Sequence, residues 1–123
     1  MQDLKTRTFN FAVEVGKLIA ELPYNTVNKA YSAQLIRCSS SVGANYRAAK
    51  RAKSDADFIN KLKIVEEEAD ETMYFLELLK VFNEELSQRI EYLLKEADEL
   101  LRIIVKSITT SREKIYNNKP RTE

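Results

Sequence analysis

The sequence predicts an all-α protein, an antiparallel up-down-up-down four-helix bundle with left-handed packing and short connections. Glycine and proline are rare, with two of each in 123 residues. Apolar residues recur at spacings of three and four, which is the period of an amphipathic helix. The stretches between these periodic segments are short and polar, which favours antiparallel neighbours. At this length we expect a single domain, residues 1–123, with a core of its own.

The overall charge is balanced, with 20 basic and 19 acidic side chains, so any electrostatic hypothesis must concern a local patch. Cys38 is the single cysteine and lies on an apolar stripe, so we expect a small buried core residue. The opening MQDLKTRTFNF lacks the apolar centre of a secretory signal. No stretch is long and apolar enough to predict a membrane span. We therefore expect a cytoplasmic protein without membrane contact.

The first helix is predicted over residues 4–22, where apolar positions alternate spacings of four and three. Asp3 is its expected N-cap, because a side-chain oxygen there accepts from the first free backbone N–H groups. Pro23 ends the helix, because the residue before a proline avoids the α region.

The second helix is predicted over residues 27–52, with Asn25 or Thr26 as its cap. Gly43 in its interior costs about 1 kcal/mol relative to alanine, so we expect a neighbouring helix to pack closely there. The core stripe of this helix is narrow and consists mostly of small residues: Tyr31, Leu35, Cys38, Val42, Asn45, Ala49 and Ala52.

The third helix is predicted over residues 55–82, opened by a capping box in which Asp57 follows Ser54. The fourth is predicted over residues 87–115, with Ser87 as its cap and a heptad rhythm of apolar residues. Residues 117–123 are polar and are expected to fray. The core stripe of the third helix is Phe58, Leu62, Val65, Ala69, Thr72, Leu76 and Leu79.

The third helix carries more apolar side chains near its end than one stripe can hold. A helix that is apolar on more than one side must bury more than one side. In a bundle of this size the surplus predicts a contact with further copies of the chain. The residues concerned are Met73, Tyr74, Phe75, Leu78, Val81 and Phe82.

Two polar features of the second helix are expected to have structural roles. If the second and third helices fold back about Ser54, Arg37 lies level with Asp70 and Glu71, and an ion pair between them would fix the register. Asn45 is the one large polar side chain on the core stripe. We interpret Asn45 as a buried amide that sets register, the alternative being a ligand or subunit contact.

The acidic run at residues 66–71 invites comparison with the di-iron carboxylate bundles. Those sites need inward-facing glutamates with histidine partners, whereas this chain has no histidine and the inward position here is Ala69. We expect a solvated acidic face, no metal, no cofactor and no enzymatic activity.

A basic cluster closes the second helix and opens the third. Such patches attract nucleic-acid phosphates through counterion release, and a tyrosine beside them can stack on a base. A solvated helix end is the alternative interpretation. The cluster comprises Tyr46, Arg47, Lys50, Arg51, Lys53, Lys61 and Lys63, and a second group on the fourth helix comprises Arg102, Lys106, Arg112, Lys114, Lys119 and Arg121.

Between residues 34 and 79 the chain carries a string of segments typical of one bacterial family. They are Gln34-Leu35-Ile36-Arg37, Ser41-Val42-Gly43-Ala44-Asn45-Tyr46-Arg47, Arg51-Ala52-Lys53-Ser54, Phe58-Ile59-Asn60-Lys61-Leu62, Glu67-Glu68-Ala69-Asp70-Glu71-Thr72 and Leu76-Glu77-Leu78-Leu79. This string resembles the four helix bundle proteins related to the 23S rRNA intervening-sequence protein, historically labelled a ribosomal protein. The first and fourth helices match only in pattern.

The resemblance implies an up-down four-helix bundle assembled as a homopentamer, without an established enzymatic activity. Some relatives are encoded inside intervening sequences of ribosomal RNA genes, and a distant branch partners a reverse transcriptase and nucleic acid. Many relatives have an acidic residue where this chain has Ala48, so the local patch is more positive here.

Two functional hypotheses follow from the residues and the resemblance together. The first is a non-enzymatic, oligomeric bundle that binds RNA or DNA through the basic end of the helical hairpin. The second is a protein-interaction scaffold without nucleic-acid binding, whose partner is a protein encoded nearby.

Overall fold

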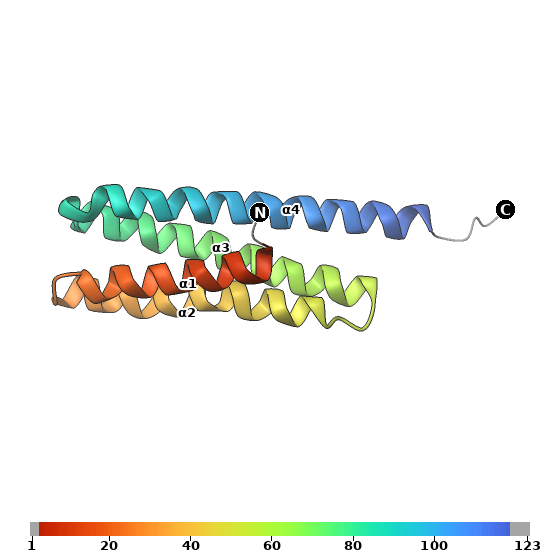
Figure 1. Cartoon of the computed structure of the whole chain (residues 1–123), viewed down its shortest axis with the longest axis horizontal. Coiled ribbons are helices and arrows are strands. Elements are labelled where there is room, and N and C mark those ends of the chain that lie inside the picture. The colour runs from red at the N-terminus through yellow and green to blue at the C-terminus, as the bar shows by residue number, and fades with distance from the viewer. Residues whose placement is uncertain (1–2, 119–123) are drawn as a thin grey trace.

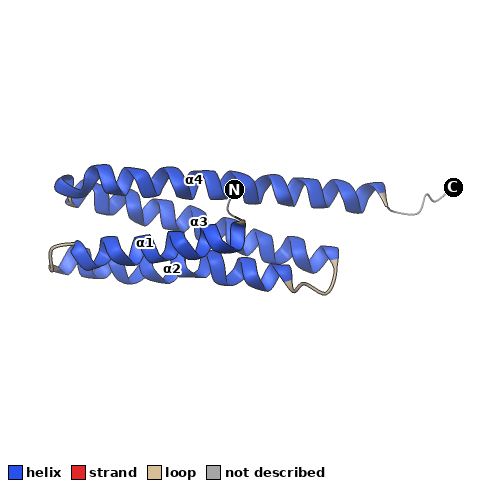
Figure 2. Ribbon diagram, viewed as in Figure 1, coloured by secondary structure: helices blue, strands red, loops and turns tan. Residues whose placement is uncertain are grey.

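Residues 3–118 form a bundle of four α-helices, as predicted. The computed structural model describes residues 3–118 and contains α1 (Leu4–Glu21), α2 (Thr26–Lys50), α3 (Asp55–Phe82) and α4 (Ser87–Asn117). A short 3₁₀ turn, η1 (Glu84–Leu86), joins α3 to α4. Figure 2 shows helices and loops only, and no strand occurs within residues 3–118.

The helices run up, down, up and down, and each packs on its neighbours in the chain (Figure 1). The bundle closes because α1 also contacts α4, whereas the diagonal pairs do not approach closely. With 18 residues, α1 is the shortest helix and α4 is the longest with 31. Towards the α2–α3 turn, α1 is therefore missing and only three helices continue, with α4 reaching furthest (Figure 1).

Three of the predicted caps are confirmed. The backbone N–H of Thr6 donates to Asp3 Oδ1 at 2.7 Å, and that of Asn28 donates to Asn25 Oδ1 at 2.8 Å. At the start of α3, the N–H of Asp57 donates to Ser54 Oγ at 3.1 Å. Because each side chain satisfies a backbone donor that has no partner within its helix, these caps fix where the helices begin.

The predicted Ser87 cap is wrong. Leu86 precedes α4 without any side-chain cap, because η1 leads directly into the helix. The turn is held by its own backbone, in which the N–H of Leu86 donates to the carbonyl of Asn83 at 3.0 Å. Helix ends also differ slightly from expectation: α2 ends at Lys50 rather than residue 52, and α4 continues to Asn117. Most of the tail predicted to fray lies outside the described residues.

The core consists of two hydrophobic clusters along the bundle axis. One joins all four helices and includes Phe11, Leu35, Leu76 and Ile90. The other joins the three helices that continue past α1 and includes Leu62. Burying apolar area at roughly 25 cal/mol per Å² is the main stabilising contribution in such a core.

The predicted core stripes are largely correct. On α3, six of the seven expected residues are buried, but Ile59 is buried in place of Phe58, which is half-buried. Cys38 is fully buried, and this burial raises the pKa of its thiol.

Gly43 marks the expected close approach between two helices, and the partner is α1. A Cβ added at Gly43 would lie 3.1 Å from Thr8 Oγ1 and 3.3 Å from Thr8 Cβ. Thr8 is itself buried. The absence of a side chain at Gly43 therefore allows α1 and α2 to pack at this separation.

Candidate nucleic-acid interface

The basic residues of the helical hairpin gather at the end of the bundle that holds the α2–α3 turn. We call Arg47, Lys50, Arg51, Lys53 and Lys63 the basic end; all five side chains are exposed. Within residues 3–118, none of them has a carboxylate within 4.0 Å, whereas Arg7, Arg37, Lys80 and Arg89 elsewhere are ion-paired. The basic end is therefore a local concentration of positive charge on a nearly neutral chain.

Arg47 lies on the side of α2 that faces α1. Its guanidinium carbon is 5.8 Å from the centre of the Phe9 ring, within the range of a cation–π contact. The contact covers part of the ring and holds the Arg47 charge at the boundary between α1 and α2.

Lys61 differs from the other cations because it is neutralised locally. Its Nζ lies 2.7 Å from Asp57 Oδ1, one helical turn earlier, and it is only half exposed. The hydrogen bond from Lys61, together with the backbone N–H of Lys53, lowers the pKa of the Asp57 carboxyl. Lys61 therefore adds little positive charge to the surface, unlike Lys63.

Tyr46 is poorly placed for the stacking role suggested by the sequence. It is half-buried and packs against the core cluster that contains Leu62. Burial and the nearby Asp3 carboxylate raise the pKa of its hydroxyl. The exposed aromatic ring at this end of α4 is Tyr116, with 76% of its surface accessible. Tyr116 was not among the residues predicted from the sequence. Its position directly after the core-facing Ile115 indicates that its ring points away from the core.

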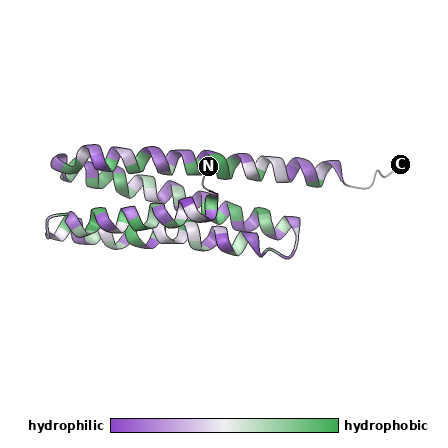
Figure 3. Ribbon diagram, in the orientation of Figure 1, coloured by the Kyte–Doolittle hydropathy of each residue, from purple (hydrophilic) through white to green (hydrophobic). Residues whose placement is uncertain are grey.

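The second basic group lies at the same end of the bundle, because the C-terminal half of α4 runs past the α2–α3 turn (Figure 1). Lys106, Arg112 and Lys114 are exposed, and so is Arg102, which is also paired with Asp98 at 3.0 Å. Lys119 and Arg121 lie outside the described residues. Figure 3 shows a hydrophilic turn between α2 and α3, consistent with a solvated and charged end.

A shallow depression of about 640 Å³ opens at the α2–α3 turn. Its lining includes the apolar residues Ala49, Ala52 and Phe58 and the two cationic residues Lys50 and Lys53. The Asp55 carboxylate is also part of the lining. The two ammonium groups suit phosphate oxygens, and the open shape places no limit on the size of the group bound.

Arg37 makes the expected ion pair across α2 and α3, but with partly different partners. Its Nη2 lies 2.5 Å from Glu71 Oε1, and its Nη1 lies 3.3 Å from Glu68 Oε2. Asp70 is exposed and takes no part. The correction follows from helix geometry: residues 68 and 71 are three apart and share the side facing α2, whereas Asp70 points to solvent.

The prediction that Asn45 is a buried amide setting register is wrong. Asn45 is half-buried, and its Nδ2 donates to the carbonyl of Ser41 on its own helix at 2.9 Å. That bond satisfies the amide locally, so no partner on another helix is required.

The apolar surplus of α3 divides into two groups. Tyr74, Val81 and Phe82 are 59%, 71% and 54% exposed, whereas Met73, Phe75 and Leu78 are half-buried. The ring of Tyr31 on α2 lies 6.2 Å from that of Phe75 and 5.9 Å from that of Phe82. The surface at this end of α3 is therefore a continuous aromatic patch.

A metal centre and a membrane-spanning helix are two other classes of site. Within residues 3–118 no three carboxylate, thiol or imidazole groups come together as metal ligands. None of the described helices combines the length and apolar character needed to cross a membrane.

Comparison with known proteins identifies the family. Residues 2–106 match the family model described as 23S rRNA-intervening sequence protein. The chain belongs to this family. A crystal structure at 1.70 Å of a family member from Bacteroides thetaiotaomicron VPI-5482, described as a protein of unknown function from the S23 ribosomal protein family, superposes with a TM-score of 0.76. The two chains are 34% identical over 86% of this chain and 98% of that one. No curated protein matches the chain.

Proposed function

We propose that this family member is a non-enzymatic, self-associating helical bundle that binds nucleic acid through its basic end in the cytoplasm. The observation that carries the proposal is the set of exposed cations at one end of the bundle that have no carboxylate partner within residues 3–118. Elsewhere on the bundle, cations are commonly held by glutamates, so an added anion would find its partners at this end.

The geometry favours recognition of the sugar-phosphate backbone over recognition of bases. Tyr46 is half-buried against the core. The basic residues lie at helix ends and in a turn, and not along one helix that could enter the major groove and contact base edges. Binding would therefore be strongly salt-dependent and weakly sequence-dependent. The family's name, which refers to an intervening sequence of 23S rRNA, supports RNA as the first substrate to test.

The test compares binding of a structured RNA hairpin and a DNA duplex by fluorescence anisotropy at low salt. The triple variant Lys50→Ala, Arg51→Ala, Lys53→Ala should weaken binding at least tenfold. The matched control Lys17→Ala, Lys80→Ala, Lys95→Ala removes the same net charge from other parts of the bundle and should change binding little. The absence of any complex between the wild-type protein and either probe would contradict the proposal.

Self-association is supported by the aromatic patch of α3. Three large apolar side chains, Tyr74, Val81 and Phe82, are more than half exposed within little more than two helical turns. Exposed apolar surface of this kind is typical of a subunit contact. Five copies are the expected number, because the family resemblance implies a homopentamer. Light scattering on the purified wild-type protein should give a multiple of 14.2 kDa, and a monomer would reject self-association.

The scaffold hypothesis makes a different prediction in a pull-down with nuclease treatment. The scaffold is favoured if a protein partner is still retained after nuclease treatment and the untreated sample contains no bound nucleic acid. Recovery of bound RNA or DNA that is lost in the Lys50/Arg51/Lys53 triple variant would favour nucleic-acid binding.

A further inference from the structure

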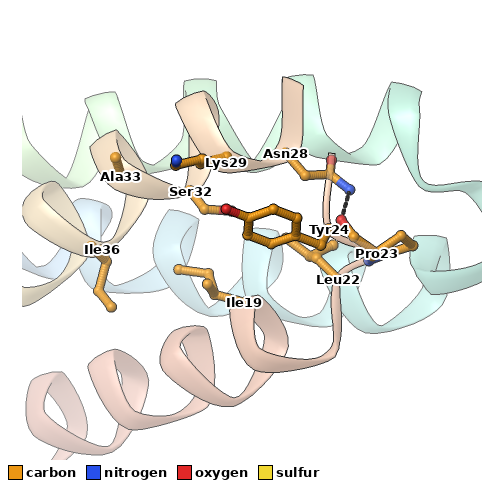
Figure 4. Close-up of a pocket in the computed structure, with 9 residues that line it drawn as sticks. All are labelled: Ile19, Leu22, Pro23, Tyr24, Asn28, Lys29, Ser32, Ala33 and Ile36. Atoms are coloured by element: carbon orange, nitrogen blue, oxygen red, sulfur yellow. Dashed lines mark hydrogen bonds between the residues drawn. The ribbon is translucent and has the colours of Figure 1, made fainter. Parts of the chain in front are cut away.

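The outer boundary between α1 and α2 is a second apolar surface, distinct from the patch on α3. Two hollows lie along it, one of about 300 Å³ near the α1–α2 connection and one of about 270 Å³ beside Gly43. We call this surface the α1–α2 seam and define it by six of the lining residues: Phe9, Ala12, Ile19, Ala33, Ile36 and Ala44. Figure 4 shows the first hollow, with the Tyr24 ring lying between Ile19 and the start of α2.

The linings of the two hollows are mainly apolar, with polar residues at Thr8, Asn28, Ser32 and Ser40, and the seam has a cation towards each end. Lys29 and Arg47 are the only charged residues lining either hollow. Each lies over an aromatic ring, Lys29 at 5.9 Å from the Tyr24 ring centre and Arg47 at 5.8 Å from that of Phe9. They are 18 positions apart on α2, which corresponds to about 27 Å.

The aromatic patch of α3 has the opposite charge pattern. Its exposed side chains Tyr74, Val81 and Phe82 form a ridge, with the exposed acids Glu67 and Asp70 before them and Glu84 and Glu85 after them. From Glu67 to Glu84 the chain covers about 25 Å at the helical rise. Glu77, which lies between, lines a hollow with Lys80 and Glu91 on the side towards α4.

The two surfaces are complementary in polarity and in the spacing of their charges. On the seam two cations lie about 27 Å apart, and on α3 acids about 25 Å apart flank exposed apolar side chains that themselves span about 12 Å. In the second hollow the small side chains of Ala12 and Ala44 leave room for part of a side chain from a ridge. We propose that the α1–α2 seam of one copy binds the α3 ridge of the next, in a head-to-tail contact.

A contact between two different surfaces has a definite consequence for assembly. Each copy keeps one unused seam and one unused ridge, so copies add in one direction until a ring closes. A dimer in which the same α3 patch meets itself would not use the seam. This inference rests on the proposed self-association and names the surfaces that carry it. It leaves Lys50, Arg51 and Lys53 exposed for nucleic acid, whereas Arg47 would face the acids of the neighbouring ridge.

The test uses two variants, each of which damages one surface by placing a charge at an exposed apolar position. Ile36→Glu alters the seam, where Ile36 is 47% exposed, and Val81→Arg alters the ridge. Both positions are exposed, so the fold should be retained, which circular dichroism checks. Tyr92→Glu is the matched control, because Tyr92 is 70% exposed on α4, diagonal to α2.

Each variant alone should be a monomer by light scattering, while the control keeps the wild-type mass. Mixed in equal amounts, the two variants should associate as a 1:1 heterodimer, because one intact ridge then meets one intact seam. If the wild type is oligomeric and Ile36→Glu has the same mass as the wild type, the seam is not the binding surface, while self-association stands. Two variants that remain monomers in the mixture would also overturn the head-to-tail contact, and a monomeric wild type would overturn both proposals.

Discussion

The side chains of Asn28 and Asn83 hydrogen-bond to each other in both directions. Asn28 Nδ2 donates to Asn83 Oδ1 at 3.0 Å, and Asn83 Nδ2 donates to Asn28 Oδ1 at 2.8 Å. Both residues are buried. Each amide also donates to a backbone carbonyl, Asn28 to Pro23 and Asn83 to Leu79, both at 2.9 Å. The pair thus joins the α1–α2 connection to the end of α3.

Replacing one member of this pair should destabilise the bundle more than a surface mutation does. Asn83→Ala leaves the buried Asn28 amide without its partner, and a buried polar group without a partner costs about 1–3 kcal/mol. Urea unfolding of Asn83→Ala, Asn28→Ala and the double variant should show a coupling energy of at least about 1 kcal/mol between the two positions. Additive losses would show that the pair does not act as a unit.

Because Gly43 contacts Thr8, the effect of Gly43→Ala on stability should change sign when Thr8 is replaced by alanine. Alanine is the better helix former by about 1 kcal/mol, but in the wild-type background a Cβ at Gly43 would lie 3.1 Å from Thr8 Oγ1. Gly43→Ala should therefore destabilise the wild type and stabilise a Thr8→Ala background. Thermal unfolding of the four proteins measures this directly.

Gly16→Ala is the matched control for that series, because a Cβ there would meet nothing within 4 Å. It should raise the free energy of unfolding by up to about 1 kcal/mol in either background. A loss of stability in Gly16→Ala would contradict the expectation that helix propensity decides the effect where packing leaves room for a methyl group.

The Arg37 ion pairs should contribute little to stability. The Arg37 side chain is 48% exposed, and exposed pairs contribute little because water and salt screen them. Arg37→Ala should lower the melting temperature slightly at low salt, and the difference should shrink at high salt. A large fall in melting temperature that persists at high salt would show that the pair is far better shielded from water than its exposure indicates.

The Asp57 carboxyl should titrate below its ordinary range, because Lys61 and the N–H of Lys53 stabilise the ionised form. Since the pKa is lower in the folded state, the associated stability is fully present above the ordinary aspartate pKa. It is lost as the pH falls through the lowered value. In Lys61→Met, NMR titration should show the Asp57 pKa rising towards its ordinary value. A pKa that does not change in this variant would exclude Lys61 as the main cause.

The helices and three of the caps were predictable because their signals are local. Asp3, Asn25 and Ser54 each bond a backbone N–H three residues ahead, so a short stretch of sequence contains both partners. The Asn28–Asn83 pair joins residues 55 positions apart. The sequence around each asparagine looks like that of an ordinary asparagine near a turn, so it does not reveal the partner. Asn45 lies on the stripe of α2, but its amide donates to the Ser41 carbonyl on the same helix, and the spacing of the stripe does not reveal this.

The basic end was predictable as a cluster, because helices that meet at one turn bring their ends together. Its composition was less predictable. Whether a lysine is free or paired depends on where a neighbouring carboxylate points, as Lys61 and Lys63 show. Tyr46 faces the core because α2 is rotated to bury Val42 and Ala49, a matter of packing that position along the chain does not reveal.

Nucleic-acid binding by the basic end is tested most directly by the dependence of affinity on salt for a structured RNA hairpin. A phosphate-binding surface gives a log–log slope that becomes less steep by about one for each cation removed. The slope should therefore become shallower by about 2–3 in the Lys50→Ala, Arg51→Ala, Lys53→Ala variant and stay unchanged in the Lys17→Ala, Lys80→Ala, Lys95→Ala control. Equal slopes in all three proteins, or no binding at low salt, would contradict the account.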